Sequence, residues 1–141
     1  MNSKTFSLFA SAILCLALSS AAGDWVVQNG GFAKFYINSI VAEGSTDGSI
    51  TTINLTTAIP DAELDRIGIT PGTSPTYSST TMNLAKSTVV INATTQKGKN
   101  MIAMVLTAIA TGKPIGICIG NYMVWSSTQS RLWCTDLMLF N

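Results

Sequence analysis

The chain has 141 residues, of which 47% are hydrophobic and only 11% are charged, and its formal net charge is +1. It contains no histidine, so the usual proton shuttle at neutral pH and the commonest metal ligand are both missing. A nearly neutral chain also lacks the basic face that a nucleic-acid partner requires. These features argue against an enzyme, a metalloprotein and a nucleic-acid-binding protein, and we expect no cofactor.

The first 23 residues have the pattern of a secretory signal peptide. Lys4 gives the n-region its positive charge. The apolar stretch after it is too short to span a bilayer. Small residues at 20–23 then provide a cleavage site. We place the cleavage before Asp24, with cleavage before Gly23 as the alternative. Cys15 is removed with the signal peptide. Because Leu14 before it is too large for a usual lipoprotein processing site, we expect no lipid anchor. We therefore expect a secreted or periplasmic protein.

The exported part, residues 24–141, is long enough for one domain and has no second apolar stretch of membrane-spanning length. Without Lys4, its seven basic residues balance seven acidic residues. It keeps two cysteines, Cys118 and Cys134, and an oxidising compartment favours a disulfide between them. Closing a loop of about 15 residues would stabilise the fold by roughly 3 kcal/mol. The alternative is two reduced cysteines in the core.

The N-terminal part predicts an antiparallel hairpin. Residues 24–31 predict a short strand or arm followed by a glycine turn, and residues 32–42 predict a long strand. That strand has apolar side chains on both faces, so we expect it to be curved. One face carries Ala33, Phe35, Ile37, Ser39 and Val41, and the other carries Phe32, Lys34, Tyr36, Asn38 and Ile40. Residues 43–48 have turn composition, and residues 49–56, rich in Ile and Thr, predict the returning strand.

The middle of the chain is less regular. Residues 60–66 predict one helical turn that starts with proline and acidic residues. Those acids, Asp61, Glu63 and Asp65, lack the glycine and the terminal glutamate of a calcium loop, so we interpret them as a solvated first turn. Residues 70–81 predict a long loop, and a loop of this length is usually functional or mobile. Residues 87–94 predict a third strand, and residues 96–100 a polar turn.

A helix and a strand follow directly. Apolar side chains recur with the period of an amphipathic helix between residues 101 and 110. Gly112 stands where a left-handed C-cap is wanted, and Pro114 fits the first residue of a strand. In that strand Ile115, Ile117 and Ile119 alternate with small residues. Because the helix has almost no polar side chain, we expect more than one of its faces to be covered, by the sheet or by other subunits.

Residues 121–131 predict a hydroxyl-rich loop, and residues 132–140 predict the last strand. The predicted order is therefore three strands, a helix and two strands. This is the order of the OB-fold, a mainly β, five-stranded Greek-key barrel with its helix between strands 3 and 4. A generic α+β domain is the alternative.

Several short motifs resemble the B subunits of pertussis-type AB5 toxins, with those of subtilase cytotoxin and typhoid toxin the nearest. The matching segments are Asp24-Trp25 after the leader, Thr111-Gly112-Lys113-Pro114-Ile115 with Ile117 after the helix, and Val124-Trp125. The order of elements matches over the whole exported chain, but the residues match only in its beginning and its last third. The resemblance implies a ring of five OB-fold subunits that binds cell-surface glycans and carries a separate catalytic A subunit.

The chain departs in three respects from this family, whose members bind sialic acid. Ala33 replaces a serine after the first-strand phenylalanine, Gly116 replaces an arginine, and the cysteine pair around the second and third strands is absent. A sugar site here must use other planar hydrogen-bonding and aromatic groups. The candidates are Asn29, Lys34, Tyr36, Tyr77, Asn121, Tyr122 and Trp125. For the subunit interface that the resemblance implies, the candidates are Met101, Met104, Val105, Ala108 and Ile109.

Two functions follow as hypotheses. The first is a secreted, non-catalytic, glycan-binding B subunit of an AB5-type toxin, assembled as a homopentamer with an A subunit. The alternative is a stand-alone secreted OB-fold module that binds a protein, as an inhibitor or adhesin does.

Overall fold

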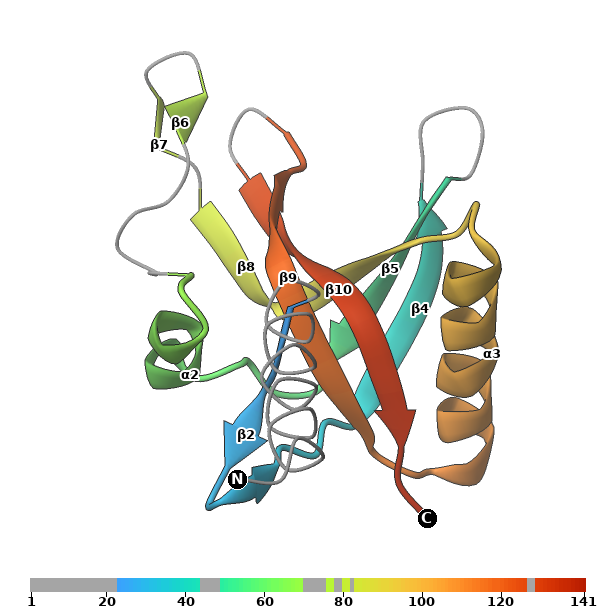
Figure 1. The fold of residues 1–141 in the computed structure, drawn as a ribbon. Coiled ribbons are helices and arrows are strands. Elements are labelled where there is room, and N and C mark those ends of the chain that lie inside the picture. The colour runs from blue at the N-terminus through green and yellow to red at the C-terminus, as the bar shows by residue number, and fades with distance from the viewer. Residues whose placement is uncertain (1–22, 44–48, 70–75, 78–79, 82, 127–128) are drawn as a thin grey trace, which may run out of the picture.

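The computed structural model describes residues 23–43, 49–69, 76–77, 80–81, 83–126 and 129–141 (Figure 1). The predicted signal peptide, except Gly23, lies outside these residues, as do most of the predicted turn at 43–48 and most of the predicted loop at 70–81. Over the described ranges the chain is mainly β, with one six-stranded sheet and two helices. Neither described helix has the length and apolar character needed to cross a membrane.

The strands are numbered in chain order. They are β1 (Asp24–Trp25), β2 (Val27–Gln28), β3 (Gly31–Phe32), β4 (Ile37–Glu43), β5 (Ile50–Leu55), β6 (Thr76–Tyr77), β7 (Thr80–Thr81), β8 (Asn83–Asn92), β9 (Ile115–Val124) and β10 (Gln129–Leu139). The helices are α2 (Asp61–Arg66) and α3 (Gln96–Thr111). The arm, the first hairpin, the helical turn and the main helix were all predicted from the sequence. The third strand begins four residues earlier than predicted.

The main sheet has the strand order β1-β9-β10-β8-β5-β4. All its neighbours are antiparallel except β10 and β8, which are parallel. Just before β4, Phe35 and Ile115 at the start of β9 exchange two backbone hydrogen bonds, of 2.9 and 2.8 Å. The sheet therefore curls back on itself, and Figure 1 shows it passing from β9 and β10 in front to β4 and β5 behind.

The hydrophobic core lies between the inner face of this sheet, α3 and α2. The predicted alternation in β9 is confirmed, because Ile115, Ile117 and Ile119 are all buried there. Leu64 of α2 and Val105 of α3 are also fully buried and join the same cluster. Each fully buried aliphatic side chain contributes roughly 1.5–3 kcal/mol relative to an exposed one.

Helix α3 begins five residues before the predicted helix. Thr95 is its N-cap, and the Thr95 hydroxyl accepts a hydrogen bond of 2.9 Å from the Gly98 N–H. The predicted polar turn at 96–100 is therefore the first part of the helix, since a capping side chain satisfies a backbone donor that would otherwise stay unpaired. At the other end Gly112 adopts the predicted left-handed conformation, with φ of 66°.

Only one face of α3 is covered in the described chain. Met101, Val105 and Ala108 are buried in the core, whereas Leu106 and Ile109 are 51% and 44% exposed. Within the described chain the sheet therefore covers one face of the helix, and the cover of a second face by other subunits stays a prediction.

Strands β9 and β10 extend into the region predicted as a loop. β9 continues to Val124 and β10 starts at Gln129, with Leu132 opposite Tyr122 and Trp133 opposite Asn121. The hydroxyl-rich composition of residues 121–131 suggested a loop. Pairing between the two strands outweighs that weak local preference.

The strand predicted at 32–42 is divided, because β3 ends at Phe32 and β4 begins at Ile37, and its face assignment holds only as far as Ile37. A register shift between Ile37 and Ser39 interrupts the pairing with β5. After it Ile40 packs against the core, while Val41 is 40% exposed. A bulge of this kind adds a residue and bends the strand, so the inward and outward positions exchange.

The predicted disulfide between Cys118 and Cys134 is not formed in the structure, where both are buried free thiols. Cys134 belongs to the core cluster, whereas Cys118 alternates with the core-facing isoleucines of β9. The two side chains therefore project from opposite faces of neighbouring strands, a geometry that a disulfide does not span. The Cys118 thiol instead accepts a hydrogen bond of 3.4 Å from the Thr135 hydroxyl.

Both thiols should resist labelling in the folded protein. Burial raises the pKa of Cys134 to about 12 and also raises the pKa of Cys118, so little reactive thiolate exists at neutral pH. Without reductant, we expect a maleimide to label neither cysteine in native protein and both in guanidinium chloride. Labelling that requires a reductant even in denaturant would demonstrate a disulfide instead.

Helix α2 holds the N-terminal arm against the domain. One oxygen of the Glu63 carboxylate accepts hydrogen bonds of 3.0 Å from the Val27 N–H and from the Arg66 guanidinium. The same Arg66 nitrogen donates a bond of 2.7 Å to the Trp25 carbonyl. Glu63 and Arg66 thus fix the backbone on both sides of Val26, which is buried in the core.

The arm contact should make stability depend on pH. The hydrogen bond from Arg66, followed by that from the Val27 N–H, lowers the pKa of Glu63. A lowered folded-state pKa contributes stability above the unfolded pKa, and this stability is lost as the pH falls through the folded value. We expect Glu63→Gln to cost about 1 kcal/mol at neutral pH and less at about pH 3, because the carboxylate contribution declines as the pH falls through the lowered folded-state pKa. Urea unfolding measures both, and an equal cost at both pH values would contradict this role.

Candidate functional site

The predicted sugar-binding residues do not form one site. Lys34 and Tyr36 flank Phe35, which pairs with Ile115 at the start of β9. Asn121 lies six positions further along β9, which corresponds to about 20 Å of strand. Tyr77 lies in β6, and its side chain is outside the described part of the structure. The six candidates other than Tyr77 therefore separate into an arm group and a hairpin group.

The arm group consists of Asn29, Lys34 and Tyr36. Asn29 is the turn residue between β2 and β3 and has a positive φ of 52°, a conformation that asparagine tolerates better than most residues. The Lys34 ammonium lies 5.2 Å from the centre of the Phe140 ring. Tyr36 is 54% exposed. Asn29 and Lys34 thus have local structural roles, and Tyr36 is the free aromatic surface of this group.

The hairpin group consists of Asn121, Tyr122 and Trp125. Tyr122 packs against the core, and the Asn121 side chain accepts a hydrogen bond of 2.8 Å from the Tyr122 N–H. Trp125 lies at the end of the hairpin, where the Arg131 guanidinium stacks 3.8 Å from the centre of its ring. Such cation–π contacts fix the orientation of both side chains.

Arg131 connects this stack to the middle of the sheet. Its Nη1 donates a hydrogen bond of 2.8 Å to the Thr52 hydroxyl on β5, and its Nε donates one of 3.3 Å to the Gln129 side chain. Strand β8 lies between β10 and β5, so the Arg131 side chain crosses β8 on the face opposite to the core. Thr52 is only 2% exposed beneath it.

Further polar side chains on the same face form a ladder across three strands. The Asn54 amide on β5 donates a hydrogen bond of 2.9 Å to the Ser39 hydroxyl on β4. The Thr88 hydroxyl on β8 donates one of 3.1 Å to the Asn54 carbonyl oxygen. We call this surface the outer polar face; it consists of Ser39, Thr52, Asn54, Thr88, Trp125 and Arg131.

The outer polar face combines hydroxyl, amide and guanidinium groups with an aromatic ring. Hydroxyls and amides both donate and accept hydrogen bonds, and a guanidinium donates several in one plane. An indole ring supplies an apolar surface for the C–H groups of a flat ligand. This set suits a polyhydroxylated ligand.

Sequence reasoning found Trp125 and missed the other members of this face. Arg131 was assigned to a loop, and its partner Thr52 is remote in sequence. The available signal was the alternation of Gln129, Arg131 and Trp133 with buried residues, which marks one face of a strand.

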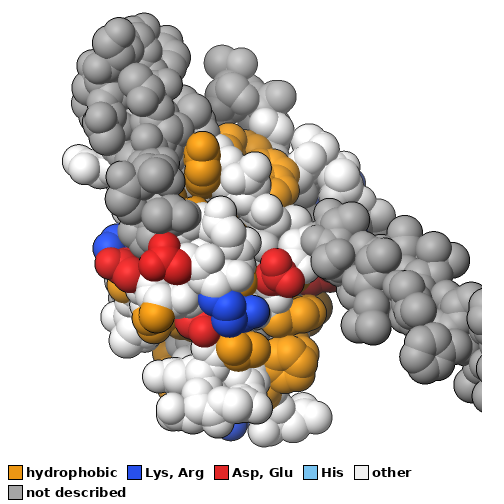
Figure 2. All heavy atoms as spheres, turned by 60° about the vertical axis from the view of Figure 1, so that its left-hand side comes forward, with side chains coloured by type: hydrophobic (Ala, Val, Ile, Leu, Met, Phe, Trp, Pro, Cys, Tyr) orange, Lys and Arg blue, Asp and Glu red, His pale blue; other side chains and the backbone are white. Residues whose placement is uncertain are grey.

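A separate group of charged residues lies on the α2 side of the molecule. Lys86 pairs with Asp61 at 2.7 Å, and Arg66 pairs with Glu63 at 3.0 Å. Figure 2 shows basic and acidic side chains intermingled on this face. Among the described residues, no three His, Cys, Asp or Glu side chains form a group that could hold a metal ion.

Four of the five predicted interface residues pack in or against the core of the chain itself. Met101, Val105 and Ala108 are buried in the core, and Met104 is partly buried against it. A neighbouring subunit could therefore contact Ile109, together with Leu106, which the prediction omitted. The side of the helix turned away from the core is the one available to a partner.

Comparison with known proteins gives no match to this chain among protein-family models, curated proteins or solved structures.

Proposed function

We propose that this protein is a secreted, non-catalytic, glycan-binding B subunit of an AB5-type toxin, built on an OB-fold barrel. The order of strand pairing supports the fold. β4, β5, β8, β10 and β9 follow one another, with β8 and β10 parallel and β4 returning to β9 through Phe35 and Ile115. With α3 between β8 and β9, the strands take the OB-fold order 1-2-3-5-4.

The observation that carries the binding proposal is the Trp125–Arg131–Thr52 arrangement. In this scheme β5 and β8 are strands 2 and 3 of the barrel, and Trp125 lies at the connection between strands 4 and 5. OB-folds bind oligosaccharides and oligonucleotides on this face and with these loops. The balanced charge of the exported chain opposes a polyanionic nucleic acid, so an oligosaccharide is the ligand we propose.

The toxin assignment adds assembly into a ring and a separate A subunit to glycan binding. The short motifs that resemble pertussis-type B subunits support membership of a ring with a separate A subunit. The exposed Leu106 and Ile109 on α3 offer an apolar contact to a neighbouring copy of the chain. Export through the predicted leader would deliver the protein to the glycans of a target cell.

A glycan array with the secreted protein tests the binding proposal. We expect binding to at least one oligosaccharide class and a loss of about tenfold or more for Trp125→Ala, because the stacking surface is removed. Tyr36→Ala is the matched control, since it removes an exposed aromatic ring from the arm group and should leave binding unchanged. An array without signal, or a loss confined to Tyr36→Ala, would refute binding at the outer polar face.

A further inference from the structure

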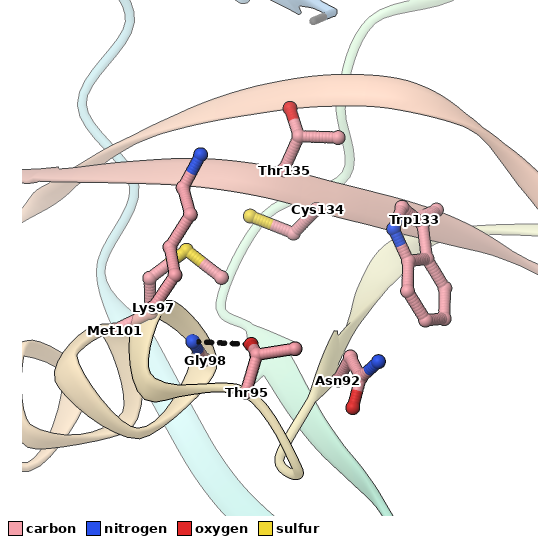
Figure 3. A pocket seen from close by; sticks show the side chains of 8 residues that line it. All are labelled: Asn92, Thr95, Lys97, Gly98, Met101, Trp133, Cys134 and Thr135. Carbon is pink, nitrogen blue, oxygen red and sulfur yellow. Dashed lines mark hydrogen bonds between the residues drawn. The ribbon is translucent and has the colours of Figure 1, made fainter.

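A cavity of about 330 Å³ opens between the first turn of α3, the end of β8 and strand β10 (Figure 3). Met101 and Cys134 form its floor, and their sulfur-bearing side chains point toward each other. Both are almost completely buried. Thr95, Asn92 and the Trp133 ring surround the opening. The cavity is thus apolar at its base and polar at its rim, with an aromatic ring at one side.

The lining of the cavity carries no net charge. Lys97 lies at its edge, but its ammonium is paired with the Asp136 carboxylate at 2.8 Å. The Cys134 thiol remains protonated at neutral pH because its pKa is raised to about 12. A cavity without an unpaired charge favours a neutral ligand, since an anion would lose its hydration without gaining an opposite charge.

The rim can still form hydrogen bonds with a ligand. The Thr95 oxygen accepts a bond from the Gly98 N–H, so the Thr95 hydroxyl proton remains available to donate. The Asn92 oxygen accepts bonds from the Thr94 N–H and hydroxyl, so the Asn92 N–H₂ group can donate. Both donors are suited to an amide carbonyl or a sugar hydroxyl placed at the rim.

We propose that this cavity binds the acetamido group of a neutral N-acetylhexosamine. The acetyl methyl fills the apolar floor at Met101 and Cys134, the acetamido carbonyl accepts from Thr95 or Asn92, and the sugar ring lies beside Trp133. The inference rests on the proposed glycan-binding function and names the sugar class. Trp133 and Arg131 lie two positions apart on the same face of β10, so one oligosaccharide could contact the cavity and the outer polar face together.

The test is a titration of the secreted protein with methyl glycosides. The NMR signal of the Trp133 indole N–H reports binding at each sugar concentration. We expect the N-acetylhexosamine glycoside to bind about fourfold or more tightly than the matching hexose glycoside, because it buries one more methyl group. We also expect it to bind more tightly than a sialoside, which is anionic. Equal binding of the hexose, or a preference for the sialoside, would overturn the inference.

Variants separate this inference from the proposed function. Trp133→Ala should weaken N-acetylhexosamine binding about tenfold, and Trp133→Leu, which keeps apolar contacts in the fold, should also weaken it. Trp125→Ala removes a ring that does not line the cavity, so it should weaken the array signal about tenfold without weakening the binding of the methyl glycoside at the cavity. Unchanged binding in both Trp133 variants overturns the cavity site. If the array is positive but the indole signal does not respond to the sugar, the cavity inference fails and the proposed function stands.

Discussion

Replacing Gly98 with alanine is expected to destabilise the protein by about 3 kcal/mol or more. Gly98 lies buried in the first turn of α3, directly against the backbone carbonyl of Asn92 at the end of β8. A β-carbon at this position would overlap that carbonyl oxygen. Since the obstacle is backbone, it cannot rotate away as a flexible side chain would. The helix and the strand would have to separate.

Lys99→Ala is the matched control for this substitution. Lys99 is the next residue on the helix and is exposed, so its removal should change the free energy of unfolding by less than about 0.5 kcal/mol. Urea unfolding of the wild type and both variants gives the comparison. A Gly98→Ala variant as stable as Lys99→Ala would mean that α3 does not pack closely on Asn92.

The second large effect concerns assembly. If rings form through the exposed side of α3, Ile109→Asp or Leu106→Asp should convert them to monomers. Each change would place an unpaired carboxylate in an apolar contact, at a cost of about 3 kcal/mol or more per interface, which weakens association over 100-fold. Because both side chains are about half exposed, the subunit itself should remain folded. Met104→Asp would not be informative, since Met104 packs against the core.

Thr107→Asp supplies the control for assembly. Thr107 is exposed on the same helix, and it lies about 100° around the helix axis from Leu106. Native mass spectrometry and sedimentation velocity should find rings of five for the wild type and Thr107→Asp, and monomers for the other two variants. Intact rings in the Ile109 and Leu106 variants would place the interface elsewhere. A monomeric wild type would refute the toxin ring and favour a stand-alone binding module.

The parts of the fold that were predicted correctly are those with local signals. The apolar period of residues 101–110, the cap at Gly112 and the alternation after Pro114 are all properties of neighbouring residues. The outer end of the β9–β10 hairpin was missed because its stability comes from pairing between residues such as Tyr122 and Leu132. Composition alone does not contain that information.

The candidate site was predicted less well than the fold. Its central contact joins Arg131 to Thr52, residues that no local pattern connects and that the sheet brings together across β8. The disulfide prediction failed for a different reason, since it rested on the number of cysteines rather than on their faces. The alternation of Cys118 with the isoleucines of β9 already placed that thiol away from the core.

The two-residue strand β1 has a consequence for the behaviour of the protein in solution. Asp24 and Trp25 pair with the outer edge of β9, opposite Ile119 and Cys118. The Arg66 guanidinium donates a hydrogen bond to the Trp25 carbonyl and so holds this strand in place. An open strand edge is a template for adding strands from other molecules. Asp24 and Trp25 therefore cover part of the β9 edge, and we expect protein that lacks them to aggregate more readily than protein that keeps them.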